Sequence, residues 1–360
     1  MEISMTFQRF ESGSAANGEL AEGCKYCING SKMVLFVTGR CKAGCFYCPV
    51  SNEKKGKDVV YANEGHALTD DAVIREAESM NAEGTGITGG DPSLVLDRTI
   101  HYIELLKDRF GKDHHIHMYT AIIDLENAKK LKVAGLDEIR YHPKEDLWDC
   151  IETTDLKAIV ETTGLDVGIE VPALPGMEDQ LCQLLKTAFG MGVKFANLNE
   201  LEFSESNWHM MDEQHLSIKD ELSSAVLGSE ETAIAVMKRL PDLPIHYCSS
   251  TFKDGIQLRN RLIRRAENIA KEYDIVTDDG TLIKGLIYAD DLDDASALLR
   301  RNYDVPDELM FIDRDRNVME IASWVLEEIG EELPFRCYIV EVYPTEDRME
   351  VERTPIRRKK

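Results

Sequence analysis

Segments typical of strands alternate with segments typical of helices between residues 33 and 204 of this 360-residue chain. The first, Met33-Val-Leu-Phe-Val37, is apolar throughout and indicates a buried strand spanning 32–38. Five further strand-like segments follow, at 84–88, 115–119, 138–141, 166–171 and 195–203. Helical patterns separate them at 70–82, 94–110, 125–134, 156–163 and 179–191. Such alternation is typical of parallel βα units, so we expect an α/β protein with six of them.

A cysteine-rich loop follows the first predicted strand. Cys41, Cys45 and Cys48 have the spacing C-x3-C-x2-C within Gly39-Arg-Cys-Lys-Ala-Gly-Cys-Phe-Tyr-Cys-Pro49. Three thiolates on one short loop can bind three irons of a [4Fe–4S] cluster and leave the fourth iron open to another ligand. Barrels of βα units carry their chemistry at the C-terminal ends of the strands, where this loop lies. A zinc knuckle or a chance grouping of cysteines is the alternative interpretation.

A glycine turn, Gly89-Gly-Asp-Pro92, follows the second predicted strand. The absence of a side chain on glycine lets the backbone approach a ligand closely. The same four residues also form a good turn sequence, so the motif is weak evidence when it stands alone. Its position one βα unit after the cysteine loop strengthens it.

The cysteine loop and the glycine turn together resemble those of radical S-adenosylmethionine (SAM) enzymes. Over about residues 30–205 the chain is similar to proteins related to pyruvate formate-lyase activating enzymes. The resemblance implies a partial (β/α)6 barrel of TIM type with SAM bound at the open iron. It implies that a low-potential donor, of the ferredoxin or flavodoxin type, supplies one electron. SAM is then cleaved to methionine and a 5′-deoxyadenosyl radical, which abstracts a hydrogen atom from substrate.

The same resemblance assigns cofactor-binding residues. The backbone of Gly89, Gly90, Asp91 and Pro92 would hold the amino group of SAM, with Asp91 in place of the family's usual glutamate. Tyr47, directly before Cys48, would lie near the adenine.

The fifth predicted strand adds two charged candidates. The stretch Gly168-Ile-Glu-Val-Pro-Ala-Leu-Pro-Gly176 resembles the one that lines the adenosyl group in family members. Strand alternation directs Glu170 and Arg140 toward the same mouth of the barrel. They would either bind polar groups of SAM or form a buried ion pair with each other.

A second group of metal-binding residue types lies outside the loop. Cys24 and Cys27 form a C-x2-C pair before the first strand, while His246 and Cys248 share one face of a strand-like segment at 243–250. These four residues suit a zinc site or a second iron–sulfur cluster. The alternative interpretation is a thiol pair without metal and a buried core cysteine.

Composition narrows the class of protein. No stretch is long and apolar enough to cross a membrane, and the N-terminal residues lack the pattern of a secretory signal. Nine cysteines that include a cluster motif fit a reducing compartment, so we expect a cytoplasmic protein without a membrane partner. The formal net charge of −24 disfavours nucleic acid, but the substrate stays open between a small molecule, a protein and an RNA. A non-catalytic, zinc-stabilised scaffold or adaptor is the alternative to an enzyme.

Three regions are expected along the chain. Residues 1–31 form an N-terminal extension that carries the C-x2-C pair, and residues 32–250 form the partial barrel. Residues 251–360 contribute a helix and a small α+β region, with Asp279-Gly280 predicted as the turn of a β-hairpin.

Overall fold

The computed structural model describes residues 7–357 and divides the chain into two compact units. The first unit extends to Glu78 and continues over Ala82–Leu258, while the second contains Ser79–Asn81 and the chain from Arg259 onward. Residues 1–6 and 358–360, which belong to the predicted N-terminal extension and C-terminal region, lie outside the described residues.

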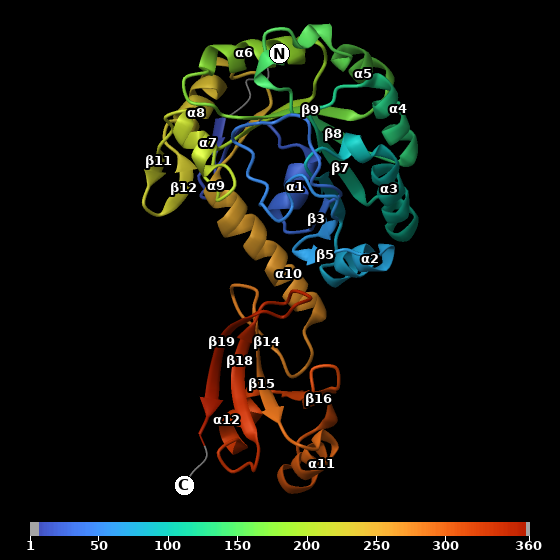
Figure 1. The fold of residues 1–360 in the computed structure, drawn as a ribbon, viewed down its shortest axis with the longest axis vertical. Coiled ribbons are helices and arrows are strands. Elements are labelled where there is room, and N and C mark those ends of the chain that lie inside the picture. The colour runs from blue at the N-terminus through green and yellow to red at the C-terminus, as the bar shows by residue number, and fades with distance from the viewer. Residues whose placement is uncertain (1–6, 358–360) are drawn as a thin grey trace. The chain divides into compact units, whose positions relative to one another are not determined.

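The first unit is an α/β fold around one curved sheet of parallel strands (Figure 1). The parallel strands, in their order across the sheet, are β3 (Lys32–Phe36), β6 (Gly84–Thr88), β7 (His115–Thr120), β8 (Glu138–Tyr141), β9 (Asp166–Pro172), β10 (Phe195–Asn199) and β13 (Ile245–Cys248). The α/β class with sequentially adjacent parallel strands is confirmed. The predicted six units are exceeded by one strand, because β13 pairs in parallel with β10.

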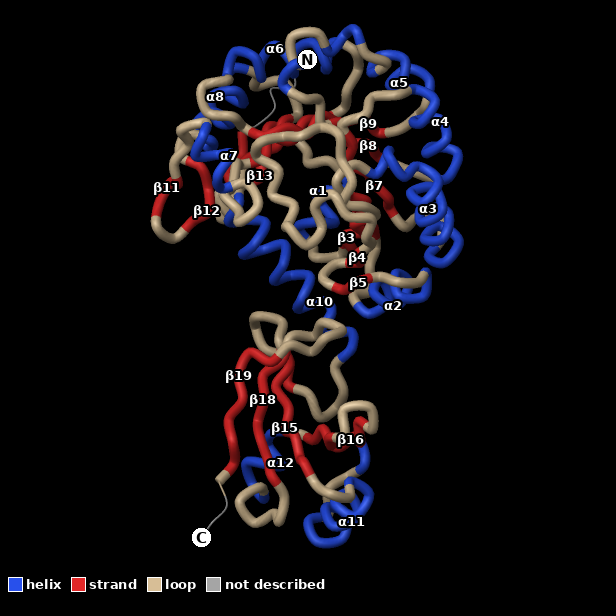
Figure 2. Tube along the Cα trace, in the orientation of Figure 1, coloured by secondary structure: helices blue, strands red, loops and turns tan. Residues whose placement is uncertain are grey.

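The sheet remains open, with an antiparallel strand pair at each edge. These edge strands are β4 (Tyr61–Ala62) and β5 (Gly65–His66) beyond β3, and β2 (Ala15–Asn17) and β1 (Phe7–Arg9) beyond β13. The helices of the βα units are α2 (Asp70–Ser79), α3 (Leu96–Phe110), α4 (Leu125–Ala134), α5 (Leu156–Thr162), α6 (Glu178–Gly190) and α8 (Ser229–Arg239). They follow the outer side of the arc of strands, and loops and turns gather on the inner side (Figure 2).

Strand alternation explains why several central strands read as polar. In β8 the apolar Ile139 alternates with Glu138 and Arg140, and in β7 Met118 alternates with His117 and Tyr119. All six side chains are wholly or largely buried, so the charged and hydrogen-bonding set belongs to an enclosed interior and not to solvent.

The helices begin and end at local sequence signals. The Asp124 side chain accepts a hydrogen bond from the Asn127 N–H at 2.7 Å and caps α4. Gly135 ends the same helix at a φ of 111°, which a residue with a Cβ rarely adopts.

The N-terminal segment is built into the first unit. Strand β2 pairs with β13, and α1 (Glu22–Ile28) contacts β3, β6 and β7. A Cβ at Gly23 would lie 2.7 Å from both Arg140 Nη2 and His117 Nδ1, so α1 packs directly on inward-facing side chains of the sheet. This placement brings the C-x2-C pair into the interior of the unit.

Short elements complete the first unit after β10. They are α7 (Trp208–Glu213), the hairpin of β11 (Ile218–Asp220) and β12 (Ser223–Val226), the short helix α9 (Ser250–Phe252) and a π-helical stretch, Lys253–Leu258.

The second unit is an antiparallel sheet with helices. Its strands are β14 (Ile275–Val276), β15 (Leu282–Tyr288), β16 (Met310–Asp313), β17 (Val318–Ile321), β18 (Arg336–Val342) and β19 (Glu350–Ile356). Its helices are α10 (Arg259–Ile269), α11 (Leu292–Tyr303) and α12 (Ser323–Ile329). Its core includes Leu299, Met319 and Leu326, each fully buried. Strands β14 and β15 pair in antiparallel fashion around Gly280, which has a φ of 80°, as the Asp-Gly turn predicts.

Among the described residues, no helix combines the length and the apolar character that crossing a membrane requires.

Candidate active site

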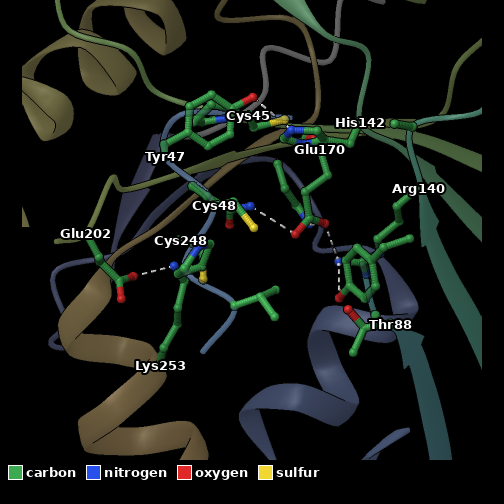
Figure 3. Close-up of a pocket in the computed structure, with 18 of the residues that line it drawn as sticks. Cys45, Tyr47, Cys48, Thr88, Arg140, His142, Glu170, Glu202, Cys248 and Lys253 are labelled. Carbon is green, nitrogen blue, oxygen red and sulfur yellow. Dashed lines mark hydrogen bonds and ion pairs between the residues drawn. The ribbon is translucent and has the colours of Figure 1, made fainter. Parts of the chain in front are cut away.

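A cavity of about 750 Å³ lies within the first unit and brings most of the predicted site residues together. Its lining includes Cys24, Cys27, Cys41, Cys45, Tyr47, Cys48, Gly89, Gly90, Arg140, Glu170, His246 and Cys248. Figure 3 shows Cys45 and Cys48 of the loop in the same pocket as Arg140, Glu170 and Cys248. Of the candidates, Asp91 and Pro92 are buried beside the cavity and do not line it.

The three loop cysteines are free thiols that line the cavity. Cys41 is exposed, whereas Cys45 and Cys48 are half-buried, and the Cys48 N–H bonds the Cys45 carbonyl at 3.2 Å in a tight turn. Burial raises the pKa of the Cys45 thiol, and Tyr47 lowers it in part. Within residues 7–357 no three His, Cys, Asp or Glu side chains surround one point closely enough for a single metal ion. A [4Fe–4S] cluster binds each thiolate through a different iron, so the donor set fits the cluster without such convergence.

The two glycines of the turn bring the end of β6 against the base of the cysteine loop. A Cβ at Gly89 would lie 2.5 Å from the Thr38 carbonyl oxygen, and one at Gly90 would lie 2.3 Å from the Arg40 carbonyl oxygen. The Gly90 N–H donates to Thr38 O at 2.7 Å and the Asp91 N–H to Arg40 O at 2.8 Å. The close backbone approach is therefore to the loop itself, and it positions the three thiols.

Asp91 joins the ends of two neighbouring strands. Its carboxylate accepts hydrogen bonds from Ser93 N–H at 3.0 Å, Thr120 Oγ1 at 2.7 Å and Ala121 N–H at 3.1 Å. Burial raises the pKa of Asp91, and these donors oppose that effect. Pro92 begins the 3-10 helix η1 (Pro92–Val95), for which Asp91 is the N-cap. Both residues shape the turn.

Tyr47 is tied to the end of β8 through His142, a residue that the sequence analysis does not select. The Tyr47 hydroxyl lies 2.9 Å from His142 Nε2, and His142 Nδ1 lies 2.7 Å from the Glu170 carbonyl oxygen. His142 also lines the cavity. Its position two residues after Arg140, directly at the C-terminal end of a parallel strand, is the signal that could have identified it.

Arg140 and Glu170 form a buried ion pair, one of the two predicted alternatives. Arg140 Nη1 lies 3.0 Å from Glu170 Oε2, and a second pair joins Arg140 Nε to Glu138 Oε1 at 2.5 Å. Glu170 also accepts hydrogen bonds from the amides of Asn197 at 2.9 Å and Asn199 at 3.0 Å. Burial alone would raise the pKa of Glu170, but Arg140 and the two amides outweigh it and lower the pKa. The two asparagines on β10, which line the cavity, are also absent from the sequence-based set.

The second cysteine group meets at the same cavity. Cys24 and Cys27 come from α1, and His246 and Cys248 from β13. Arg140 Nη2 lies 3.4 Å from Cys24 Sγ. Burial opposes ionisation of Cys24, but Arg140 and His246 outweigh it and lower its pKa to about 7. Burial raises the pKa of Cys27 and of Cys248.

Two lysines complete the wall of the cavity. Lys32, the first residue of β3, is buried beside Cys27. Lys253 lies near Cys248 and forms an ion pair with Glu202. Lys32 could have been noticed as a charged residue at the start of an apolar strand.

The fold and the cavity define an α/β protein with a thiol-lined pocket at the carboxyl ends of its parallel strands. A model of the radical SAM superfamily matches residues 35–145, and a domain of unknown function matches residues 280–356. A protein of Methanocaldococcus jannaschii is 42% identical over 361 aligned positions, which cover 95% of this chain and 94% of that protein. It carries the provisional name "glycyl-radical enzyme activating enzyme".

Solved structures of low identity resemble the fold in part. A methylornithine synthase is 12% identical with a TM-score of 0.42, over 59% of this chain and 63% of the synthase. A maturase of the [FeFe]-hydrogenase is 16% identical with a TM-score of 0.40, over 68% of this chain and 65% of the maturase. This chain therefore spans less than two thirds of either protein.

The chain belongs to the radical SAM superfamily. It is therefore an enzyme of SAM-dependent radical chemistry, and a [4Fe–4S] cluster and SAM are the cofactors that its family uses.

Proposed function

We propose that Cys41, Cys45 and Cys48 hold the [4Fe–4S] cluster and that SAM binds beside it in the cavity of the first unit. When bound, the reduced cluster and SAM supply a 5′-deoxyadenosyl radical that abstracts a hydrogen atom from substrate. The observation that carries the proposal is that all three loop thiols line one cavity together with Gly90, Tyr47 and Glu170.

The glycine turn is suited to hold the ammonium group of SAM. The N–H groups of Gly90 and Asp91 are already bonded to the carbonyls of Thr38 and Arg40. Gly90 lines the cavity and has its carbonyl oxygen to offer to an ammonium group, whereas the Asp91 carbonyl already accepts a hydrogen bond from the Leu94 N–H at 3.1 Å.

The charged groups of the cavity are held in fixed positions before any ligand enters. Glu170 is restrained by Arg140, Asn197 and Asn199, and it presents a carboxylate of lowered pKa to the cavity. Such a carboxylate complements the sulfonium of SAM or hydroxyl groups of its ribose. Preorganised polar groups in an enclosed site also exclude water from a reactive radical.

We propose a glycine of a partner protein as the hydrogen donor and a ferredoxin- or flavodoxin-type protein as the electron donor. The name of the Methanocaldococcus jannaschii relative supports the protein substrate. The net charge of −24 makes RNA less favourable as a substrate, because phosphates are repelled by an acidic surface.

Anaerobic reconstitution with iron and sulfide, followed by addition of dithionite and SAM, tests the SAM cleavage. We expect 5′-deoxyadenosine from the wild type and none from C41A, C45A or C48A. C150A is the matched control, because Cys150 is half-buried and does not line the cavity. A colourless protein that binds zinc and no iron would support a scaffold and overturn the proposal, as would unchanged cleavage in a loop variant.

Deuterium transfer tests the substrate. A candidate glycyl-radical enzyme labelled with deuterium at the glycine α-carbons should pass deuterium into 5′-deoxyadenosine and acquire a glycyl radical signal in electron paramagnetic resonance (EPR). Cleavage of SAM without transfer from that protein would reject the protein substrate while leaving the SAM chemistry intact.

A further inference from the structure

Three thiols that the proposed SAM chemistry does not use line the same cavity as the cysteine loop. Cys24 and Cys27 lie three residues apart on α1, about one helical turn, and Cys248 is the last residue of β13. Each of the three sulfurs is close enough to the other two for their charges to interact. Segments more than 200 residues apart in the sequence thus bring three free thiols to one wall.

Positive charge surrounds these sulfurs. The Arg140 guanidinium lies 3.4 Å from Cys24 Sγ, Lys32 lies beside Cys27, and Lys253 lies near Cys248. The Asn197 amide adds a donor 3.5 Å from Cys24 Sγ. Arg140 and Lys253 each also pair with a carboxylate, Glu170 and Glu202. The same cations, together with Lys32, would stabilise the negative charge of three thiolates that bind a metal centre.

A histidine beside the thiols has a ring nitrogen without a partner. His246 is 6% exposed and lines the cavity, and its Nδ1 has no hydrogen-bond partner in the part of the chain that the structure describes. Strand alternation places it on the same face of β13 as Cys248. A buried imidazole nitrogen without a partner is costly, and coordination of a metal removes that cost.

We propose that Cys24, Cys27 and Cys248 bind a second iron–sulfur cluster of the [4Fe–4S] type and that His246 is its fourth ligand. The proposal goes beyond the SAM chemistry, which requires only the loop cysteines. Zinc requires all its ligands at about 2.0–2.3 Å from one ion. In the described residues these four side chains do not surround a single point, and a cluster does not need one, because it binds its ligands through several irons.

The loop cysteines and the second set of cysteines can be tested separately in the full-length chain. The variant C41A/C45A/C48A removes the loop site, so any cluster that remains belongs to the second group. After anaerobic reconstitution we expect about four irons and about four sulfides per chain in this variant, against about eight of each in the wild type. The variant C24A/C27A/C248A should also keep about four, and C150A should match the wild type.

The fourth ligand has its own spectroscopic signature. Reduction of C41A/C45A/C48A should give the EPR signal of a reduced cluster with a nitrogen hyperfine coupling. Adding H246A should remove that coupling while most of the iron is kept, since three thiolates still hold the cluster.

Iron counts decide the proposal. If C41A/C45A/C48A retains a wild-type circular dichroism spectrum but binds no iron, or binds one zinc in place of iron, the second cluster is rejected. If that variant does not fold, the wild type and C24A/C27A/C248A still decide, because equal iron in the two also rejects it. None of these outcomes depends on SAM cleavage, which tests the loop site alone.

Discussion

Tyr47 donates a hydrogen bond of 2.9 Å to His142 and thereby joins the cysteine loop to the residue that directly follows β8. The direction follows from the other ring nitrogen. His142 Nδ1 lies 2.7 Å from the Glu170 carbonyl, which can only accept, so Nδ1 carries the proton and Nε2 accepts from the phenol. The loop between Cys45 and Cys48 is thus held to β9 through one imidazole.

Replacing Tyr47 by phenylalanine tests this connection. Y47F keeps the ring but loses a hydrogen bond worth about 1 kcal/mol, so we expect the formation of 5′-deoxyadenosine to slow about fivefold. Iron content should stay at the wild-type level, because the three thiols are unchanged. Y102F, which alters a buried tyrosine outside the cavity, is the control. Equal rates in Y47F and the wild type would show that the bond does not contribute to the reaction.

The ion pairs of Arg140 predict an asymmetry between two variants. R140M leaves both Glu138 and Glu170 buried without their cation, so we expect a loss of about 3–5 kcal/mol in the free energy of unfolding. E170Q leaves Arg140 paired with Glu138 and should lose about 1–3 kcal/mol. Chemical denaturation of the full-length variants measures both losses in the free energy of unfolding. A smaller loss in R140M than in E170Q would contradict the view that Arg140 neutralises two carboxylates.

Most of the architecture of the first unit could be predicted from the sequence, because its strands and helices have clear periodicity. The start of β3 at Lys32 and the hairpin at Gly280 follow from local patterns. The sequence predicts a strand at 243–250 but does not indicate that it joins the sheet as the seventh parallel strand, β13. The segment between β10 and β13 contains a hairpin of its own, which obscures the βα alternation.

The candidate site could be predicted only where the spacing of residues along the sequence indicates a chemical role. The cysteine motifs and the glycine turn are of this kind. His142, Asn197 and Asn199 belong to no motif, and they reach the cavity because neighbouring parallel strands are in register. Asn197 pairs with Glu170 across β10 and β9, a relationship that depends on sheet register and that one sequence does not reveal.

The contact of Gly90 with the cysteine loop predicts that a single methyl group disrupts the cluster site. In G90A the new Cβ would lie 2.3 Å from Arg40 O and 2.7 Å from Gly39 O, and both are backbone atoms that cannot rotate away. We expect G90A to lose most of its loop-bound iron and at least 90% of its SAM cleavage, measured after anaerobic reconstitution. G190A is the matched control, since a Cβ there meets no atom within 4 Å. Equal iron contents in G90A and G190A would contradict this role of Gly90.

A buried histidine directly before β7 predicts how stability depends on pH. Burial, with Lys107 nearby, lowers the pKa of His114 to about 4 from an ordinary value of 6.5. Its ring stacks on Phe110, and its Nε2 lies 2.9 Å from Thr85 Oγ1. Between pH 6.5 and 4 the unfolded chain binds a proton at this position and the folded chain does not. Acidification therefore lowers the free energy of unfolding by up to about 3 kcal/mol. The stability that the neutral His114 ring contributes is fully present above pH 6.5.

The variant H114Q isolates this contribution, because glutamine keeps a hydrogen-bonding group for Thr85 and does not titrate. We expect its free energy of unfolding to fall less steeply than that of the wild type as the pH drops from 7 to 4.5, measured by urea denaturation at several pH values. H209Q is the matched control for loss of an imidazole, because the side chain of His209 is 88% exposed. A wild-type slope in H114Q would show that His114 takes up its proton equally well in the folded and unfolded chains, and the burial of its ring against Phe110 would then have no electrostatic consequence.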